Sequence, residues 1–202
     1  MIKTRTHIIL ASTSARRREM LHFLGLRFTS KASGVEEKLG PLVHRLHDKP
    51  AEHAVSLATM KADDVARGRR RPCLVVAADT IVVMGNRIIG KPSGPRDAER
   101  ILGLLSGKAH TVITGVCMVK LPEQVSLAFS VSTEVTMARL TAHDIRWYVR
   151  TGEPMDKAGA YGIQGLGGIF IKRINGSYTN VVGLPLPEVI AALKKLGAIE
   201  LG

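Results

Sequence analysis

The chain has 202 residues, of which 45% are hydrophobic and 4% are aromatic, and its formal net charge is +12. This composition predicts a globular protein with an aliphatic core, and the positive charge indicates an anionic partner such as nucleic acid, a nucleotide or acidic lipid. No apolar run approaches the ~18 residues that a membrane span needs, which excludes a transmembrane protein.

Strands and helices alternate in the predicted elements from the start of the chain. In chain order we expect a strand at 6–11, a helix at 14–24, a strand at 26–32, a loop at 33–47, a helix at 50–67, strands at 73–84 and 87–89, and a helix at 95–106. Then follow a hairpin of two long strands at 109–120 and 125–139, a helix opened by the capping box of Thr141 and Asp144, a glycine-rich loop at 152–168, a strand at 169–174 and a helix at 186–196. This order predicts a mixed α/β fold with a mixed sheet, as one bilobed domain over residues 1–202.

Both cysteines, Cys73 and Cys117, lie in apolar runs typical of strands, and neither belongs to a CxxC pair. We predict that they are buried packing residues, as in a reducing compartment. The histidines have neither metal-ligand spacing nor a defensible Ser/His/Asp order, which argues against a zinc site and a serine hydrolase. The N-terminus has neither a long apolar core nor a cleavage pattern, so we expect no signal peptide and a cytoplasmic location.

Three consecutive arginines occupy the first turn of the helix predicted at 14–24. Arg16, Arg17 and Arg18 follow the hydroxyl-rich segment Ser12-Thr13-Ser14, where the helix dipole favours acidic residues. Free N–H groups, hydroxyls and guanidinium groups together make an anion site. The alternative is that the arginines extend into solvent. Three consecutive side chains of a helix cannot all point one way, so we expect one or two of these arginines to bind an anion.

Two further charged residues stand on apolar surfaces. Lys61 lies on the apolar stripe of its helix, four residues after Leu57 and four before Val65, so it either extends to solvent or meets an anion. Asp79 interrupts the apolar strand CLVVAADTIVVM, where a carboxylate must be paired, protonated or bound to metal. We favour a reactive or metal-binding carboxylate over a structural partner for an arginine.

Three weaker motifs complete the candidate set. The segment GNRIIGKP begins like a P-loop, but Pro92 stands where a hydroxyl is needed, so we reject that match and keep Lys91 as a phosphate ligand of another kind. The segment DKAGAYGIQGLGG offers backbone donors to a ligand. The acidic pair Glu36-Glu37 is either solvated charge or a second carboxylate for a divalent ion.

In order along the chain, the motifs LASTSARR, GVEE, AADTIV, GKP, DKAGAYGIQGLGG, INGSY and VVGLPL, with Lys61 in its helix, resemble those of the Maf family of nucleoside triphosphate pyrophosphatases, from about residue 8 to residue 187. The DKAGAYGIQG form is similar to the branch that prefers dTTP and UTP. The resemblance implies an ITPase-like mixed α/β fold with a deep cleft between two lobes. It also implies hydrolysis of pyrimidine triphosphates, including modified ones, between the α- and β-phosphates, and some members are linked to arrest of septum formation.

The resemblance also implies roles for single residues. Asp79 would be the proton acceptor, and a divalent cation (Mg²⁺, Mn²⁺ or Co²⁺) would bind beside Glu37 and Asp79. The triphosphate would be surrounded by Ser12, Arg16, Arg17, Lys61 and Lys91. Base preference would depend on Arg16, Thr80 and Gln164. Ala15 stands where many members carry proline, which favours that helical position but carries no charge.

The resemblance implies a homodimer, and we expect a nucleoside triphosphate as substrate, without a stable nucleic acid partner and without a membrane. The alternative is a basic regulatory protein that binds a nucleotide or nucleic acid without catalysis. The pI of about 10.2 supports this alternative. The scarcity of aromatic residues for base stacking argues against it.

Overall fold

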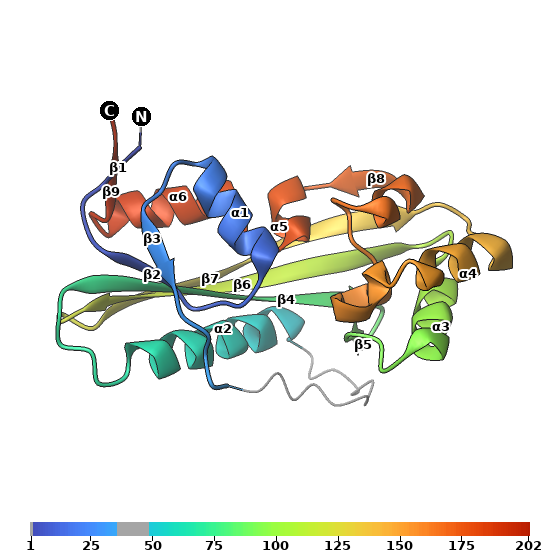
Figure 1. Cartoon of the computed structure of the whole chain (residues 1–202), viewed down its shortest axis with the longest axis horizontal. Coiled ribbons are helices and arrows are strands. Elements are labelled where there is room, and N and C mark those ends of the chain that lie inside the picture. Colours follow the sequence, from blue (N-terminus) through green and yellow to red (C-terminus); the bar gives the residue numbers. More distant parts are fainter. Residues whose placement is uncertain (1, 36–48) are drawn as a thin grey trace.

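A twisted sheet organises the part of the chain that the computed structural model describes, residues 2–35 and 49–202. Its strands run in the order β3, β2, β4, β6, β7, β8, with β5 beside β4 (Figure 1). They are β2 (Ile8–Leu10), β3 (Phe28–Ser30), β4 (Cys73–Met84), β5 (Arg87–Ile89), β6 (Ala109–Leu121), β7 (Val125–Met137) and β8 (Ile171–Asn175). β2 runs parallel to β3 and β4, and the other described pairs of this sheet are antiparallel, so the sheet is mixed, as predicted.

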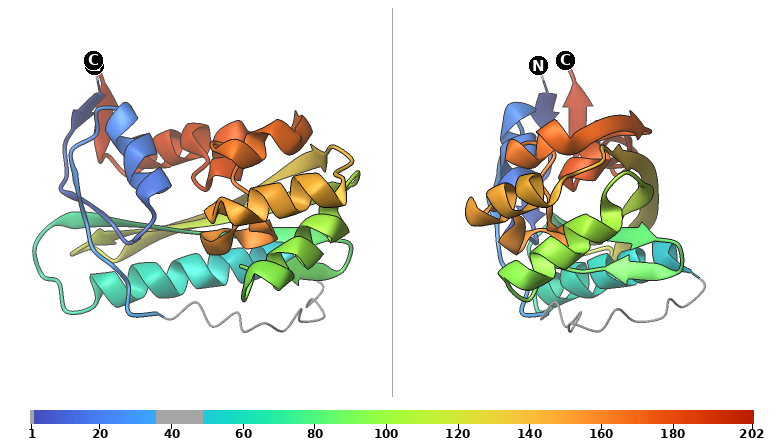
Figure 2. Two further views of the ribbon diagram at one scale, coloured as in Figure 1. Left: turned by 45° about the vertical axis from the view of Figure 1, so that its right-hand side comes forward. Right: turned by 90° about the vertical axis from the view of Figure 1, so that its right-hand side faces the viewer.

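Helices cover both faces of the long strands. They are α1 (Ala15–Phe23), α2 (Pro50–Ala66), α3 (Pro95–Leu105), α4 (Ala142–Arg150), α5 (Tyr178–Val182) and α6 (Leu186–Lys195), with the 3-10 turns η1 (Glu153–Asp156), η2 (Ala158–Ala160) and η3 (Leu166–Phe170). Figure 2 shows α2 on one side of the long strands and α5 and α6 on the other. The capping box of Thr141 and Asp144 opens α4, as predicted.

Strand β4 lies in the interior, between β2 and β6. Ten of its twelve residues are buried, which explains why its sequence is a continuous apolar run rather than an alternating one. β6 and β7 form the predicted long hairpin. Cys73 and Cys117 are both buried and free, in agreement with their prediction as packing residues.

Helix α2 approaches the sheet closely at Gly115 of β6. A Cβ atom at this position would overlap the main chain of Ala54 and Val55 in α2. Gly115 lies directly opposite Asp79 in the register of β4 and β6, and opposed residues share one face of a sheet. The glycine therefore allows α2 to lie close to the face from which Asp79 projects.

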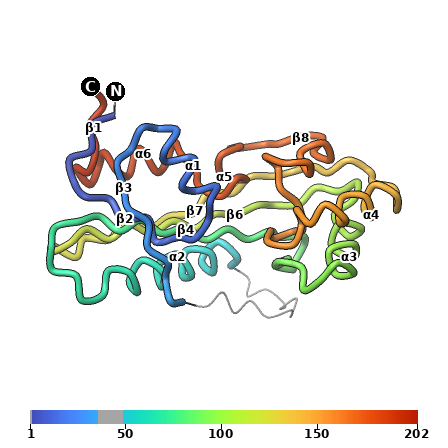
Figure 3. Tube along the Cα trace, viewed as in Figure 1, coloured from blue at the N-terminus to red at the C-terminus, as the bar shows by residue number. Residues whose placement is uncertain are grey.

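The side chains form two lobes at the two ends of the long strands. One core joins α1 and α6 to β2 and the start of β4, through residues such as Leu21, Leu193 and Leu74. The other joins α3 and α4 to the end of β4 and to β6, through residues such as Leu102 and Val82. Figure 3 shows both chain ends at one end of the molecule and α3 and α4 at the other. The predicted bilobed arrangement is thus confirmed.

Each predicted strand and helix has a counterpart, and the structure adds short elements that we did not expect. β1 (Ile2–Thr4) pairs with β9 (Ile199–Leu201) and joins the two ends of the chain. The segment predicted as the loop 152–168 contains η1 and η2, and α5 follows β8. These elements are three to five residues long, so they are too short for a periodic pattern. Within the described residues, none of the helices combines the length and apolarity needed to cross a membrane.

Candidate active site

A cleft with a volume of about 930 Å³ lies between the two lobes, along the edge of β4. β2 pairs with residues 74–76 of β4 and β5 with residues 82–84. Between these two pairings, no described strand covers residues 77–81 on that edge. The cleft opens there, with residues 11–17 on one wall and residues 153–165 on the other. This cleft is the one that the resemblance implied.

Lys61 and Asp79 form a buried ion pair at the cleft. The Nζ atom of Lys61 donates to Oδ1 of Asp79 over 2.6 Å, and each residue is 6% exposed. The pair joins α2 to β4, and both residues line the cleft. Of the possibilities left open for Asp79, the structure realises a paired carboxylate, and its partner is a lysine rather than an arginine.

Arg17 connects three parts of the fold across the opposite face of β4. Its Nε donates to the carbonyl oxygen of Gly183 over 2.8 Å, and its other nitrogens donate to the hydroxyl groups of Thr80 (2.9 Å) and Ser12 (3.4 Å). The residue is 9% exposed. Thr80 also shares a hydrogen bond with Thr114 over 2.9 Å. Much of the donor capacity of Arg17 therefore holds α1 against the sheet.

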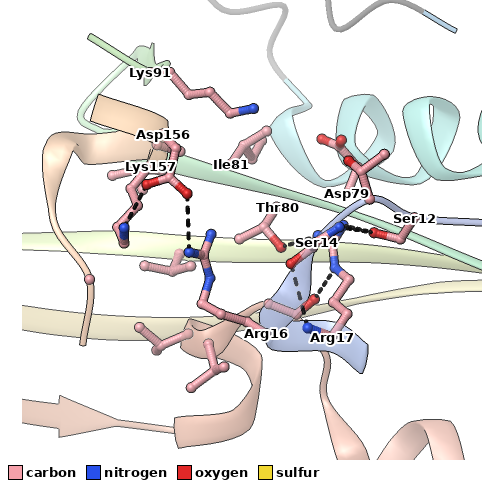
Figure 4. Close-up of a pocket in the computed structure, with 18 of the residues that line it drawn as sticks. Ser12, Ser14, Arg16, Arg17, Asp79, Thr80, Ile81, Lys91, Asp156 and Lys157 are labelled. Carbon is pink, nitrogen blue, oxygen red and sulfur yellow. Dashed lines mark hydrogen bonds and ion pairs between the residues drawn. The ribbon is translucent and has the colours of Figure 1, made fainter. Parts of the chain in front are cut away.

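Arg16 reaches across the cleft to the other wall. Its guanidinium lies 3.5 Å from Oδ2 of Asp156, whose Oδ1 accepts from Lys157 over 2.6 Å (Figure 4). The Arg16 side chain is one-third exposed, so solvent and ligands can reach it. Arg18 does not line the cleft and donates to the carbonyl oxygen of Thr13 over 2.9 Å. The three arginines thus have three different sets of partners, because consecutive side chains of a helix point in different directions.

Further cations and hydroxyls complete the walls. Figure 4 shows Lys91, Asp156 and Lys157 on one side of the cleft and Ser12, Asp79 and Arg17 on the other. Lys91 is exposed and follows β5 without opening a helix, since α3 begins at Pro95, which agrees with our rejection of a P-loop.

The glycine-rich segment is anchored by a single carboxylate. Glu153 accepts from the hydroxyl of Tyr148 (2.7 Å) and from the backbone N–H groups of Leu166 (2.9 Å) and Gly167 (3.0 Å). Desolvation acts to raise the pKa of Glu153, but these hydrogen bonds outweigh it and hold the pKa below its ordinary value. Gln164 lies between the anchored positions, is exposed and lines the cleft.

Two carboxylates were predicted to bind a divalent cation, Glu37 and Asp79. Glu37 lies outside the described residues, so its role beside a metal stays a prediction. Among residues 2–35 and 49–202, no three or more His, Cys, Asp or Glu side chains form a group that could hold an ion. Asp79 is a carboxylate in the cleft, and Mg²⁺ commonly uses one or two protein carboxylates together with phosphate oxygens. The donor set of Asp79 and a bound polyphosphate therefore fits a hard divalent cation.

Four residues of the site did not figure among our sequence-based candidates: Tyr148, Glu153, Asp156 and Lys157. Asp156 and Lys157 stand at the start of the DKAGAYGIQGLGG motif, so the motif itself could have indicated them. Glu153 and Tyr148 act on backbone groups more than ten residues away, and no local pattern signals such contacts. All of the site residues that we predicted from the sequence and that the structure describes line the cleft: Ser12, Arg16, Arg17, Lys61, Asp79, Thr80, Lys91 and Gln164.

Comparison with known proteins agrees with the fold and the motifs. A dTTP/UTP pyrophosphatase of Moorella thermoacetica is 47% identical over 190 residues, which is 94% of this chain and 95% of the relative. A dTTP/UTP pyrophosphatase of Geotalea uraniireducens is 45% identical over 202 residues, 99% of this chain and all of the relative. The structure of a HAM1 protein from Coxiella burnetii has a TM-score of 0.52 at 16% identity, over 94% of this chain and 99% of that one, and so shares the fold. Residues 7–196 match the family described as Maf-like protein, and the chain belongs to that family.

Proposed function

We propose that this chain is a nucleoside triphosphate pyrophosphatase that hydrolyses dTTP, UTP and modified pyrimidine analogues to a nucleoside monophosphate and pyrophosphate. The observation that carries the proposal is the buried pair of Asp79 and Lys61 beside a cleft lined by further cations. The names of the relatives from Moorella and Geotalea support the same reaction.

The charges of the cleft suit a triphosphate. Arg16, Lys91 and Lys157 come from separate segments and line one space, where they can neutralise a polyanion. Arg16 offers a planar fork for phosphate oxygens, whereas the two lysines offer point charges. Arg17 contributes mainly by fixing the wall from which Arg16 projects, because its donors already hold Gly183, Thr80 and Ser12.

Asp79 is the carboxylate to which we assign proton transfer in the cleft. Water attacks a phosphorus atom of the α–β bridge, a new P–O bond forms, and the bridging P–O bond breaks with its electron pair leaving on the departing phosphate group. The carboxylate of Asp79 takes the proton from the attacking water. General base catalysis of this kind raises the rate of a reaction by about 10²–10⁴-fold. Lys61 orients that carboxylate through the hydrogen bond of 2.6 Å.

A divalent cation fits this site when a polyphosphate is present. Asp79 would hold it together with phosphate oxygens, and Glu37 is the predicted second carboxylate. The bound cation would neutralise charge on the phosphates. Removal of divalent ions by a chelator should abolish turnover, and added Mg²⁺, Mn²⁺ or Co²⁺ should restore it.

Base preference would arise at the glycine-rich wall. The amide of Gln164 carries both a donor and an acceptor, which matches the O4 and N3–H groups that uracil and thymine share. Arg16 and Thr80 are the other two positions assigned to base preference. Thr80 lies beneath Arg17 and donates to or accepts from Thr114, so its effect on the base would be indirect.

The decisive experiment measures pyrophosphate release from purine and pyrimidine triphosphates with each divalent cation. We expect fast release from UTP and dTTP and little from GTP and ATP. Equal rates on all of them would refute the role of Gln164. Salt-sensitive binding of DNA without any pyrophosphate release would favour the alternative of a non-catalytic binding protein.

We propose that the enzyme works as a cytoplasmic homodimer, which light scattering of the purified chain and fractionation of its cells would test. A link to septum formation would depend on catalysis if overproduction of the wild type, but not of Asp79→Asn, blocks division.

A further inference from the structure

The carboxylate of Glu153 and the hydroxyl of Tyr148 together hold a short segment of the cleft wall. Glu153 accepts from the N–H groups of Leu166 and Gly167 and from the Tyr148 hydroxyl, and that hydroxyl accepts in turn from the N–H of Gly162 (3.0 Å). The segment 162–167 is therefore attached at its start to Tyr148 and at its end to Glu153, and a hydrogen bond joins these two side chains.

Two glycines of this segment lie so close to these side chains that an added Cβ atom would overlap them. A Cβ atom at Gly165 would overlap the carboxylate of Glu153, and one at Gly167 would overlap the hydroxyl of Tyr148. The glycine pattern is thus an independent sign that the segment is built around the Glu153 carboxylate.

Gln164 lies between the two attachments and lines the cleft. Its side chain is exposed, so little besides the position of its main chain fixes where its amide can reach. Main-chain hydrogen bonds on either side of Gln164 lead to Glu153 directly or through Tyr148. The direction in which Gln164 presents its amide therefore depends on Glu153.

We propose that Glu153 is a positioning residue for base selection, which holds the Gln164 segment so that pyrimidine triphosphates are preferred over purine triphosphates. The inference rests on the proposed function and adds a residue to it. In this proposal Glu153 acts through Gln164.

The contact between Lys157 and the main chain of Glu153 allows base selection to be tested separately from phosphate binding. The ammonium group of Lys157 donates to the backbone carbonyl oxygen of Glu153 over 2.7 Å and to the carboxylate of Asp156. Substitution of the Glu153 side chain leaves that carbonyl in place. The cations that face the triphosphate should therefore stay where they are when the carboxylate is changed.

The test is the variant Glu153→Gln, which keeps the shape but replaces one acceptor oxygen by a donor NH₂ group that faces other donors. We would measure kcat/KM for UTP and GTP, and the inhibition constant of inorganic tripolyphosphate, which has no base. We expect the UTP/GTP ratio to fall at least tenfold, with the inhibition constant changed less than twofold.

Tyr148→Phe removes the hydroxyl that links Glu153 to Gly162 and should lower the ratio in the same direction, which keeps the test decisive if Glu153→Gln does not fold. Asp144→Asn is the matched control, because this carboxylate also accepts hydrogen bonds, from Thr141 at the start of α4, but does not line the cleft. It should lower the melting temperature without changing the ratio.

Two results would overturn the inference alone: an unchanged UTP/GTP ratio in both Glu153→Gln and Tyr148→Phe, or an equal loss of affinity for UTP and tripolyphosphate. A wild-type protein that releases no pyrophosphate from any triphosphate would instead refute the proposed function, and the inference with it. A wild-type protein that is equally active on UTP and GTP would refute base selection at this site altogether.

Discussion

The ammonium nitrogen of Lys61 lies 2.6 Å from a carboxylate oxygen of Asp79, and both side chains are buried between α2 and β4. A buried charge that loses its partner is destabilising by about 3–5 kcal/mol. The two residues therefore form one unit, in which stability and the proposed chemistry depend on the same atoms. Single substitutions at either position will affect both, and only combined variants can separate them.

Asp79→Asn should reduce pyrophosphate release at least about 100-fold, because the amide cannot accept the proton of the attacking water. It should also lower the free energy of unfolding, since Lys61 then faces an amide. The double variant Lys61→Met/Asp79→Asn removes both charges and should recover much of that stability without recovering turnover. Thermal unfolding and a pyrophosphate assay would measure the two effects. Near-normal turnover in either variant would rule out Asp79 as the proton acceptor.

The two arginines of the cleft should respond differently to the same change. Arg17→Lys replaces a buried fork that serves Gly183, Thr80 and Ser12, so it should lower the free energy of unfolding by at least about 1.5 kcal/mol. Arg16→Lys should change that free energy by less than about 0.5 kcal/mol, because its side chain is one-third exposed. It should instead raise KM for UTP. Denaturant unfolding and steady-state kinetics would measure the two effects. A larger loss of stability in Arg16→Lys than in Arg17→Lys would contradict this assignment.

Gly115→Ala should disturb α2 and, through it, Lys61. The added methyl group would overlap the main chain of Ala54, so the helix must move away from the sheet. We expect a loss of several kcal/mol in stability, as for overpacked cores, together with reduced turnover. The matched control is Gly103→Ala on the exposed side of α3, where a Cβ meets nothing within 4 Å. That variant should be more stable than wild type by about 0.5–1 kcal/mol. Equal stability of the two variants would contradict the close approach of α2.

Stability should fall as the pH is lowered from about 6.5 to 4, in part because of His110. Burial lowers the pKa of His110 to about 4 in the folded chain, so in this window the unfolded chain binds more protons than the folded one. Protonation of the unfolded chain then lowers the free energy of unfolding by roughly 3 kcal/mol across the window. In His110→Gln, which keeps a polar partner for the Tyr161 hydroxyl, the fall should be smaller by that amount. Unfolding curves at a series of pH values would measure it, and an equal fall in both proteins would contradict the assignment.

The local sequence determined most of the elements of this protein. The apolar run CLVVAADTIVVM predicts β4 with its observed bounds, because a strand that is buried on both faces needs apolar residues throughout. Lys61 and Asp79 were predicted separately as site residues, because each is a charged residue among apolar ones. Arg16 and Arg17 were predicted as site residues because the first turn of a helix favours acidic residues over basic ones. Such contradictions are visible in the sequence since they concern neighbours along the chain.

Which charges meet was decided only by the tertiary structure. Lys61 and Asp79 are 18 positions apart in the sequence, and their contact depends on how closely α2 lies to β6, which Gly115 allows. The division of labour between Arg16 and Arg17 depends on Gly183, more than 160 residues away. No local pattern predicted the role of Glu153, because two of its three partners are backbone N–H groups, which are the same at nearly every position of a chain. Sequence patterns record the burial of a residue, whereas the partners of a charge depend on distances that only the folded chain sets.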